Sequence, residues 1–312
     1  MQISSKPVLR VAAALLAFAI IAGILLFANG LVGNPISRML ANRSARRYVA
    51  STYSDRNLEL EKARYDFKSG SYYVHVKSSK SIDTRFSLNV TPSGKVRYDD
   101  HEFRVLGKSN TFERINDEYR QAIRRVIDAG DFPYKSYIGY GEIAPYYERK
   151  DFGPLYGLVL DELALDKVYD VMGLAETAGH IVLYIEDETV TVTRAAEILL
   201  NLKSIFASKG ISFYAIDFDL IKPRGDDKPA LDEPRVSVQD FLYEDIYEEG
   251  LAERVAAADQ ALREYYAEQD AKLAKQDEEA GGVARRAAEL FFHHAAVSEK
   301  GSRRQPRAAE SG

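Results

Sequence analysis

Val11-Ala-Ala-Ala-Leu-Leu-Ala-Phe-Ala-Ile-Ile-Ala-Gly-Ile-Leu-Leu-Phe27 is the stretch of the chain that decides its architecture. It lies within a run without charged residues that extends from Arg10 to Arg38. As an α-helix, residues 11–32 rise about 33 Å at about 1.5 Å per residue, enough to cross a hydrocarbon core of about 30 Å. We therefore expect one transmembrane helix at residues 11–32, in contact with membrane lipid, behind a basic head at residues 1–10.

A cleaved signal peptide is the main alternative for this segment, because Ala28-Asn29-Gly30 offers small residues at the two positions that a signal peptidase inspects. The apolar core of a signal peptide is typically about 7 to 15 residues long, whereas this one is apolar for at least 17 residues. The chain has no cysteine, which excludes disulfides, lipoprotein attachment and palmitoylation. We expect the segment to be retained as a signal anchor.

The charges around the span give conflicting indications of its orientation. Lys6 and Arg10 precede it, whereas four arginines follow it closely: Arg38, Arg43, Arg46 and Arg47. Counted alone, the positive-inside rule favours a cytoplasmic C-terminal part. The signal-anchor layout, with a short basic head, a span and then a large folded region, favours the opposite, and the lack of cysteine suits an oxidising exterior. We expect the C-terminal domains to lie outside the cell membrane.

The charge distribution divides the rest of the chain into two domains and a tail. Residues 38–130 carry 19 Lys and Arg against 12 Asp and Glu, a net charge of +7, whereas residues 131–270 carry 13 against 29, a net charge of −16. We expect a membrane-proximal α+β domain at residues 33–130, an acidic α+β domain at residues 131–276 and a disordered tail at residues 277–312. The basic part suits anionic headgroups or wall polymers, but two solvated surfaces of opposite sign are the plainer interpretation.

The membrane-proximal domain is predicted to contain one helix followed by an antiparallel meander. Asn34-Pro35 is typical of an N-cap with proline at the first helical position, and it opens a helix that reaches about Tyr53. Alternation of apolar and polar residues indicates strands at 58–60, 63–67, 72–76, 86–90 and 96–98. Lys68-Ser69-Gly70 and residues 91–94 supply hairpin turns. A sheet with one apolar face needs the helix as its cover.

The acidic domain is predicted to mix helices and strands. A helix that bridges the domains begins at Asn110-Thr-Phe-Glu113, which resembles a capping box, and ends near Gly130. Periodicity indicates strands at 155–160, 181–185, 214–220 and 235–240, and helices at 168–178, 193–208 and 250–276. The apolar run at 181–185 suits a central strand. Residues 223–234 are a polar hairpin or surface loop, and residues 284–297 have the composition of a short amphipathic helix within the tail.

The five histidines give little support for catalysis. His75 falls on the polar face of its strand, His101 lies in an acidic turn, and His180 precedes an apolar strand as a loop or edge residue. His293 and His294 lie in the tail. The sequence contains no metal-ligand spacing of Cys and His, no nucleophile elbow and no phosphate-cradling glycine loop. We therefore assign no catalytic, cofactor-binding or metal-binding residue and expect no cofactor.

Asp217 and Asp219 form the carboxylate pair most worth weighing. They lie two apart on a predicted strand, so they project from the same face, opposite Ile216 and Phe218. With other acids of the domain they would be able to bind Ca²⁺ or act as an acid–base pair; these acids are Asp161, Glu162 and Asp166. Solvated surface charge is the plainer interpretation. A site would require Asp217 or Asp219 at the floor of a pocket beside a third acid.

Six tyrosines lie near the start of the acidic domain, and they are Tyr134, Tyr137, Tyr140, Tyr146, Tyr147 and Tyr156. Gly139, Gly141 and Gly153 lie between them. Amphipathic rings on flexible backbone suit a protein or glycan contact surface, and covering the seam between the domains is the alternative. The basic residues of the first domain lack the aromatic interleaving of a nucleic-acid binder, so we expect no nucleic acid as a partner.

Four stretches carry a family resemblance, and they are Asn34-Pro-Ile-Ser-Arg-Met-Leu-Ala-Asn-Arg43, Gly70-Ser-Tyr-Tyr-Val-His-Val-Lys77, Glu113-Arg-Ile-Asn-Asp-Glu-Tyr-Arg120 and Ser212-Phe-Tyr-Ala-Ile-Asp-Phe218. They resemble the YfjL-like membrane proteins of Bacillus-type bacteria, over roughly residues 8–275. The resemblance implies one N-terminal membrane helix and a two-part soluble region, and it carries over no catalytic residue. In outline, the helix and meander are also similar to the cystatin-like domains of membrane-anchored cell-wall regulators, a likeness of fold alone.

These features predict an α+β protein that crosses the cell membrane once. We expect an extracytoplasmic interaction or regulatory protein without catalytic activity, which contacts an unidentified protein or cell-envelope polymer. The alternative is a membrane-bound hydrolase or a Ca²⁺-binding protein that uses carboxylates of the acidic domain.

Overall fold

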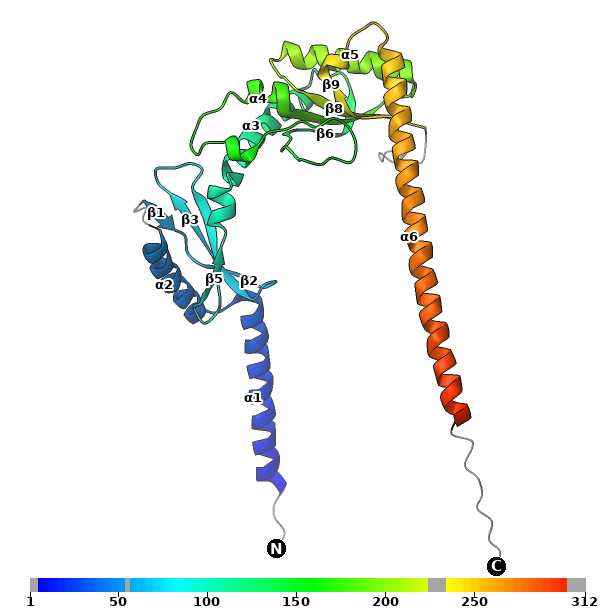
Figure 1. The fold of residues 1–312 in the computed structure, drawn as a ribbon. Helices are drawn as coiled ribbons and strands as arrows, with labels where there is room; N and C mark the ends of the chain where they lie inside the picture. Colours follow the sequence, from blue (N-terminus) through cyan, green and yellow to red (C-terminus); the bar gives the residue numbers. More distant parts are fainter. Residues whose placement is uncertain (1–4, 54–56, 224–233, 302–312) are drawn as a thin grey trace, which may run out of the picture.

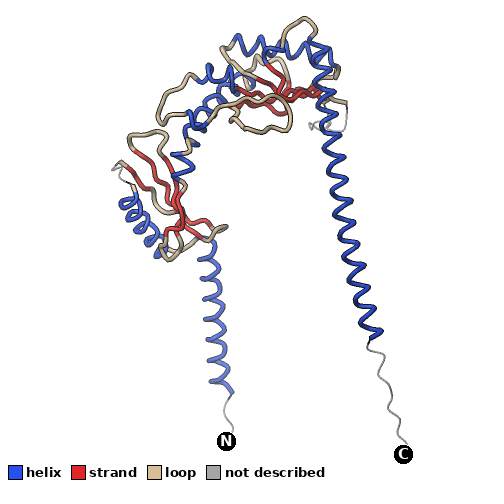
Figure 2. Tube along the Cα trace, viewed as in Figure 1, coloured by secondary structure: helices blue, strands red, loops and turns tan. Residues whose placement is uncertain are grey.

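The computed structural model describes residues 5–53, 57–223 and 234–301 of the 312-residue chain. Figure 1 shows two lobes with a long helix at each end: α1 (Ser5–Val32) leads into the first lobe, and α6 (Leu251–Gly301) leaves the second. Each lobe contains one sheet, drawn in red in Figure 2. The predicted α+β class, with a long apolar N-terminal helix, is confirmed.

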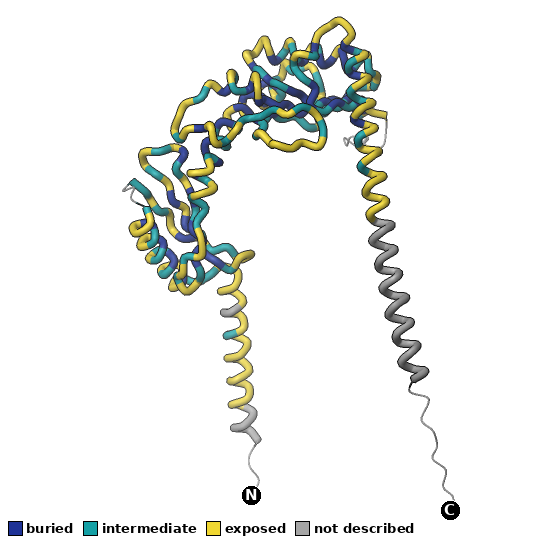
Figure 3. Tube along the Cα trace, in the orientation of Figure 1, coloured by how far each residue is buried: buried dark blue, intermediate teal, exposed yellow. Residues whose placement is uncertain are grey.

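α1 stands clear of both lobes, and its side chains are exposed along almost all of its described length (Figure 3). Its apolar window has a mean hydropathy of 2.8, and none of that window is buried inside the protein. The helix has 28 residues and rises about 42 Å. α1 is therefore long and apolar enough to cross a membrane.

Gly33 ends α1 and allows the chain to turn into α2 (Pro35–Thr52). Its φ of 70° lies in the left-handed region, and a Cβ at this position would lie 2.5 Å from the hydroxyl oxygen of Tyr72. Both the conformation and the close approach require glycine. Asn34 then caps α2 as predicted, because its side chain accepts a hydrogen bond from the Ser37 N–H and Pro35 takes the first helical position.

The first lobe is an antiparallel sheet covered by α2. Its strands are β1 (Leu58–Leu60), β2 (Arg64–Asp66), β3 (Ser71–Ser78), β4 (Arg85–Val90) and β5 (Val96–Asp99). The order is β1-β3-β4-β5, and β2 also pairs with β3. β1 and β2 therefore share one edge of β3, so the predicted simple meander is wrong at this edge. Ala41, Ala45 and Val49 of α2 are buried in the core of the lobe, as the predicted helical cover requires.

The second lobe is a four-stranded mixed sheet with helices packed on one face. Its strands lie in the order β6 (Lys135–Ile143), β7 (Gly179–Glu186), β8 (Ala215–Ile221) and β9 (Val236–Leu242). β7 and β8 are parallel and are connected through α5 (Val192–Ser208), and the other pairs are antiparallel. The predicted central position of residues 181–185 is confirmed, because β7 lies between β6 and β8.

Helices cover one face of this second sheet and leave the other half-covered. Ile181, Leu183, Ile216 and Phe218 are buried in a core that includes α3 (Ser109–Ile127), α4 (Val171–Ala178) and α5. Strand alternation places the remaining side chains on the opposite side. We call this side the open face, and it carries Tyr140, Glu142, His180, Val182, Tyr184, Asp217, Asp219, Ser237 and Gln239. Parts of α6 and of the loop after β6 line cavities over it.

α3 belongs mainly to the second lobe. Its residues Ile115, Tyr119 and Ile123 are buried in the second core, so the second core begins before residue 130, where the sequence placed the boundary. The predicted capping box is wrong: the N-cap is Lys108, without a side-chain cap, and Asn110 instead donates hydrogen bonds to carbonyls of the first lobe.

Asp83, in the loop between β3 and β4, is the buried carboxylate at the joint between the lobes. It is 1% exposed. It accepts hydrogen bonds of 2.8 Å from the Arg114 Nε and Nη2, of 2.9 Å from the Thr111 hydroxyl and of 2.8 Å from the Asp166 N–H. Burial acts to raise the pKa of Asp83, but the guanidinium of Arg114 and the other donors outweigh it and hold the pKa below its ordinary value.

Two predicted elements of the second lobe differ from the structure. Residues 155–160 form a single bridge between Leu158 and Pro145 and then the short helix η2 (Leu160–Glu162) instead of a strand, because Gly157 adopts a φ of 133°. β6 is the second difference, because the sequence pattern predicts no strand in this region, which is rich in tyrosine and glycine. Gly141 of β6 faces the covered side, where a Cβ would clash with Ile123. The strand therefore lacks an apolar residue at a position where alternation of apolar and polar residues would need one.

α6 extends beyond the predicted helix end at residue 276. It continues to Gly301, which differs from the disorder predicted for residues 277–301. Alanine, glutamate and arginine are strong helix formers, and they sustain the helix through Gly281 and Gly282. Residues 302–312 of the predicted tail, and residues 224–233 of the predicted loop, lie outside the described residues.

Replacing Asp83 by asparagine is expected to lower the free energy of unfolding by about 3 kcal/mol, because the charge of Arg114 then loses its buried partner. The matched control is Glu61→Gln, whose pair with Arg64 spans 3.6 Å between exposed side chains and is expected to matter by less than about 1 kcal/mol. Urea denaturation of the detergent-solubilised chain, followed by tyrosine fluorescence, measures both. Equal losses in the two variants would contradict the assigned role of Asp83.

Candidate functional site

Two cavities lie side by side on the open face and share Asp217 and Gln239. The larger, of about 610 Å³, is bounded by α6 and includes Asp219 and Tyr266. The smaller, of about 410 Å³, is bounded by the loop after β6 and includes His180. Ionisable side chains of three strands therefore line cavities that are partly open to solvent.

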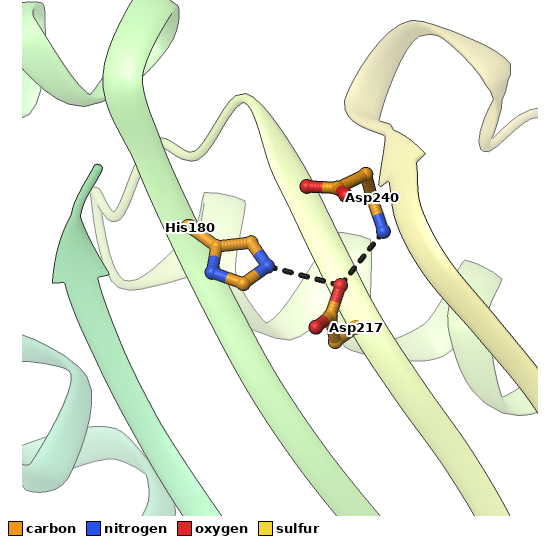
Figure 4. Close-up of side chains that lie close together, drawn as sticks. All are labelled: His180, Asp217 and Asp240. Carbon is orange, nitrogen blue, oxygen red and sulfur yellow. Dashed lines mark hydrogen bonds and ion pairs between the residues drawn. The ribbon is translucent and has the colours of Figure 1, made fainter. Parts of the chain in front are cut away.

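His180, Asp217 and Asp240 form a cluster at the smaller cavity, one from each of β7, β8 and β9 (Figure 4). The His180 Nε2 lies 3.0 Å from the Asp217 Oδ1, which also accepts a hydrogen bond of 2.7 Å from the Asp240 N–H. One ligand atom from each side chain lies within 4.8 Å of those from the other two. His180 and Asp240 are buried, and Asp217 is half-buried.

A β-bulge directs Asp240 into this cluster. Gln239 and Asp240 of β9 together oppose the single residue Asp217 of β8, since the register moves from Ile216–Phe241 to Phe218–Val238. Asp240 adopts a φ of 51°, a left-handed conformation that aspartate tolerates better than most residues. Without the bulge, alternation would turn its side chain toward the covered face. Bulges of this kind re-aim side chains and are common beside functional sites.

The Asp240 carboxylate has partners on one oxygen only. Its Oδ1 accepts a hydrogen bond of 2.6 Å from the Tyr156 hydroxyl and lies 2.7 Å from the Lys150 Nζ. Its Oδ2 is buried without a hydrogen-bond partner. Gly153 approaches this atom so closely that a Cβ there would lie 2.7 Å from it. Burial, followed by the charge and hydrogen bond of Asp240, raises the pKa of Tyr156, which therefore keeps the proton that it donates.

His180 lies between two carboxylates. Its Nδ1 is 3.4 Å from the Glu142 Oε1. Its Nε2 is close enough to Asp217 for an ion pair. The two atoms do not form a hydrogen bond, because the ring N–H is not directed at the carboxylate oxygen. Burial lowers the pKa of His180, but Asp217 and Glu142 outweigh it and raise the pKa to about 9. At neutral pH the imidazole is therefore protonated in this structure.

The chemistry of the cluster is that of a cation site. Three carboxylates (Glu142, Asp217 and Asp240) face the positive charges of His180 and Lys150. The imidazole and the aspartates are also donors that a metal ion accepts. Among the described residues that line the smaller cavity, none is Ser, Thr or Cys, so the cavity offers no hydroxyl or thiol nucleophile other than tyrosine.

The structure confirms that Asp217 and Asp219 share a face but separates their surroundings. Asp217 joins the cluster with Asp240 as the third acid that a site requires. Asp219 lines the larger cavity instead, and burial raises its pKa. Asp161 and Glu162 are exposed in η2, and Asp166 contacts Asp83 at the joint between the lobes. The alternative in which Asp161, Glu162 and Asp166 join Asp217 and Asp219 in one site is therefore wrong.

The interpretation of His180 as a loop or edge residue is wrong, because it lies within β7, between β6 and β8, and is 8% exposed. His75 is exposed on β3 beside Ser87, as predicted. His101 is half-buried and lies 4.6 Å from the Tyr53 ring centroid to centroid. His293 and His294 belong to α6, where side chains are outside the described set.

The six tyrosines do not form one surface. Tyr137, Tyr146 and Tyr147 are exposed. Tyr134 accepts a hydrogen bond from the Asn201 side chain on α5, Tyr140 is half-buried on the open face, and Tyr156 packs against the His180 cluster. The six tyrosines therefore form neither the single contact surface nor the cover of the seam between the lobes that the sequence suggested.

Fold and site together define a class: a two-lobed α+β protein with an exposed apolar N-terminal helix and a buried His–Asp cluster on a half-covered sheet. The chain belongs to the YfjL-like family. The YfjL-like N-terminal domain matches residues 8–100, and the YfjL-like C-terminal domain matches residues 118–256, which include the whole cluster. No curated protein and no solved structure matches the chain. The family resemblance seen in the sequence is confirmed.

Replacing His180 by glutamine is expected to remove a pH dependence of stability. Because the folded-state pKa of His180 is raised to about 9 from about 6.5, its stabilising contribution is fully present below about pH 6.5 and is lost as the pH rises through about 9. The wild type should lose up to about 3 kcal/mol across this window relative to the variant. Urea unfolding at pH 6 and pH 9.5 measures this, with His75→Gln as the exposed control. Parallel wild-type and His180→Gln profiles would contradict the assignment.

Proposed function

We propose that the protein is a single-pass membrane-anchored interaction or regulatory protein, with both lobes outside the cell and without catalytic activity. The observation that carries the proposal is the open face of the second sheet. Ionisable side chains of this face line two adjoining cavities. A surface of this kind suits a bound partner or ligand. We further propose a regulatory role for the first lobe, on the likeness in outline of its predicted helix and meander to cystatin-like domains.

The anchor follows from α1. An exposed helix of this apolarity is unfavourable in water, and lipid is the environment that satisfies it. Exposed arginines of α2 lie directly after the span and support the placement of the first lobe at the headgroups; they are Arg38, Arg43, Arg46 and Arg47. Ile36 and Met39 are exposed on the same helix and suit the apolar part of the interface.

A carboxylate-dependent hydrolase is the alternative, and the arrangement that it requires, with Asp217 in a pocket beside another acid, is present. Two features favour binding instead. The raised pKa of His180 leaves it protonated at neutral pH, when a general base must be neutral. Lys150 and Tyr156 both occupy the Oδ1 of Asp240.

Protease added to intact protoplasts is expected to digest both lobes and to leave the N-terminal segment in the membrane fraction. Permeabilised protoplasts serve as the control for accessibility, and a cytosolic marker protein reports leakage. Full protection of the lobes in intact protoplasts would overturn the proposed orientation, and recovery of the chain in the soluble fraction would overturn the anchor.

A photoreactive amino acid in place of Gln239 is expected to crosslink a partner or envelope polymer in intact cells, because Gln239 lies on the open face between both cavities. The matched control replaces Glu197, which is exposed on α5 at the opposite side of the sheet. Bands of equal intensity from the two positions, or none from Gln239, would contradict the assignment of the open face as the contact surface.

A further inference from the structure

We propose that His180, Asp217 and Asp240 bind a divalent transition-metal ion of the Zn²⁺ class, and that the ammonium group of Lys150 occupies part of this site in the metal-free protein. The inference deepens the proposed function, on which it rests, by naming the ligand class of the open face. Its first support is geometric: three side chains from three adjacent strands bring one nitrogen and two oxygen donors within 4.8 Å of one another.

The second support is independent of the clustering and comes from unpartnered atoms. The Asp240 Oδ2 is buried without a hydrogen-bond partner. The His180 Nε2 is also buried and makes no hydrogen bond, and its one polar contact is the 3.0 Å ion pair with Asp217. The Asp240 side chain is 4% exposed and the His180 side chain is 10% exposed. Figure 4 shows the His180 ring and the Asp240 carboxylate on neighbouring sides of the cluster. Buried polar atoms without partners are rare and costly, and an ion that is bound only part of the time is a recognised reason for them.

Glu142 supplies the third support, because it orients His180 for coordination. Its Oε1 lies 3.4 Å from the Nδ1 of His180. The imidazolium releases its Nε2 proton to solvent when the metal ion binds. The remaining ring proton, on Nδ1, then points toward this carboxylate, and the Nε2 lone pair is available beside Asp217 and Asp240. Histidine ligands of metals are commonly held in this way by a carboxylate on the other ring nitrogen.

The donor set selects the class of ion. One imidazole and two carboxylates suit Zn²⁺ and neighbouring transition metals, which accept nitrogen and oxygen ligands together. Ca²⁺ and Mg²⁺ favour sets made of oxygen alone and usually of more ligands. Three protein ligands also leave a coordination position for water or for a group of the partner.

Lys150 explains how the carboxylates are stabilised without the ion. Its Nζ lies 2.7 Å from the Asp240 Oδ1, on a side chain from the loop after β6 that is 26% exposed. A flexible, partly exposed lysine is able to leave when a divalent ion arrives, and it then continues to lie near the Tyr156 ring, 4.5 Å away in the present structure. Metal binding would thus move the Lys150 side chain, which lines the smaller cavity.

The test is calorimetric titration of the full chain in detergent with ZnCl₂ after treatment with a chelator. The double substitution His293→Ala and His294→Ala forms the parent, because an adjacent histidine pair is a separate source of zinc binding. We expect one Zn²⁺ per chain and much weaker binding of Ca²⁺ and Mg²⁺. Asp240→Asn is expected to weaken Zn²⁺ binding at least tenfold, and Glu142→Gln by about 10-fold to 100-fold.

Lys150→Met provides the decisive variant, because it removes the competing cation while leaving the ligands in place. It is expected to tighten Zn²⁺ binding at least threefold, an outcome that general damage to the fold does not produce. Asp219→Asn, on the same strand and face as Asp217 but outside the smaller cavity, is the matched control and should bind as the parent does. Circular dichroism checks that each variant is folded.

Absence of Zn²⁺ binding by the parent, unchanged affinity in folded Asp240→Asn, weaker binding by Lys150→Met, or a preference for Ca²⁺ would each overturn the inference. The crosslinking result at Gln239 separates this failure from failure of the proposed function. Crosslinks without zinc binding leave the contact surface standing and remove the metal, whereas zinc binding without crosslinks retains the metal and removes the partner surface.

Discussion

The second sheet is covered by helices on one face and only partly covered on the other, and this constraint determines where most polar side chains of β7 and β8 lie. Because strands alternate, the residues that fill the core on β7 and β8 force their neighbours onto the open face. His180 and Asp217 are brought together in this way, since β7 and β8 run parallel and start at the same end of the sheet. A sheet covered on both faces would need apolar residues at these positions, so the incomplete cover is what makes a charged cluster possible.

Asp83 imposes a comparable constraint on the arrangement of the lobes. Its carboxylate receives donors from α3 and from the loop after η2, while it belongs to the first sheet's β3–β4 loop. A buried carboxylate must satisfy its lone pairs, and here it does so only when both lobes contribute. The joint therefore links the first lobe, which α1 leads into, to the lobe that carries the cluster.

The sequence predicted those features that depend on local pattern. Asn34 and Pro35 start α2 as expected, because capping and proline chemistry act within one turn, and the alternation in β3, β4 and β8 identified them as strands. The capping box at Asn110 failed because tertiary acceptors, the carbonyls of Asp83 and Arg85, compete for the same side chain. β6 was not recognised as a strand because Gly141 occupies a core-facing position where the alternating pattern needs an apolar residue. Close packing against Ile123 leaves no room for a side chain there.

Half of the candidate site was within reach of sequence reasoning. The shared face of Asp217 and Asp219 follows from spacing alone, and a parallel pairing of the predicted strands at 181–185 and 214–220 would have brought His180 near Asp217. Asp240 was out of reach, because only the bulge opposite Asp217 turns its side chain to the open face. Register irregularities of this kind arise from pairing between strands and leave no periodic trace in one strand's sequence.

Charge balance explains why the cluster is stable in its observed form and yet suited to exchange. Glu142, Asp217 and Asp240 carry three negative charges, and His180 and Lys150 together supply two positive ones. His180 and Asp240 are buried, and attraction between charges is stronger there than in water. The excess of one negative charge, and an aspartate oxygen without a partner, leave the cluster with a net attraction for cations.

The arginine-rich α2 belongs to the other lobe and, beyond a Debye length of about 8 Å, solvent ions screen its charges from the cluster. The cation attraction of the cluster is therefore set by the charges of the open face itself.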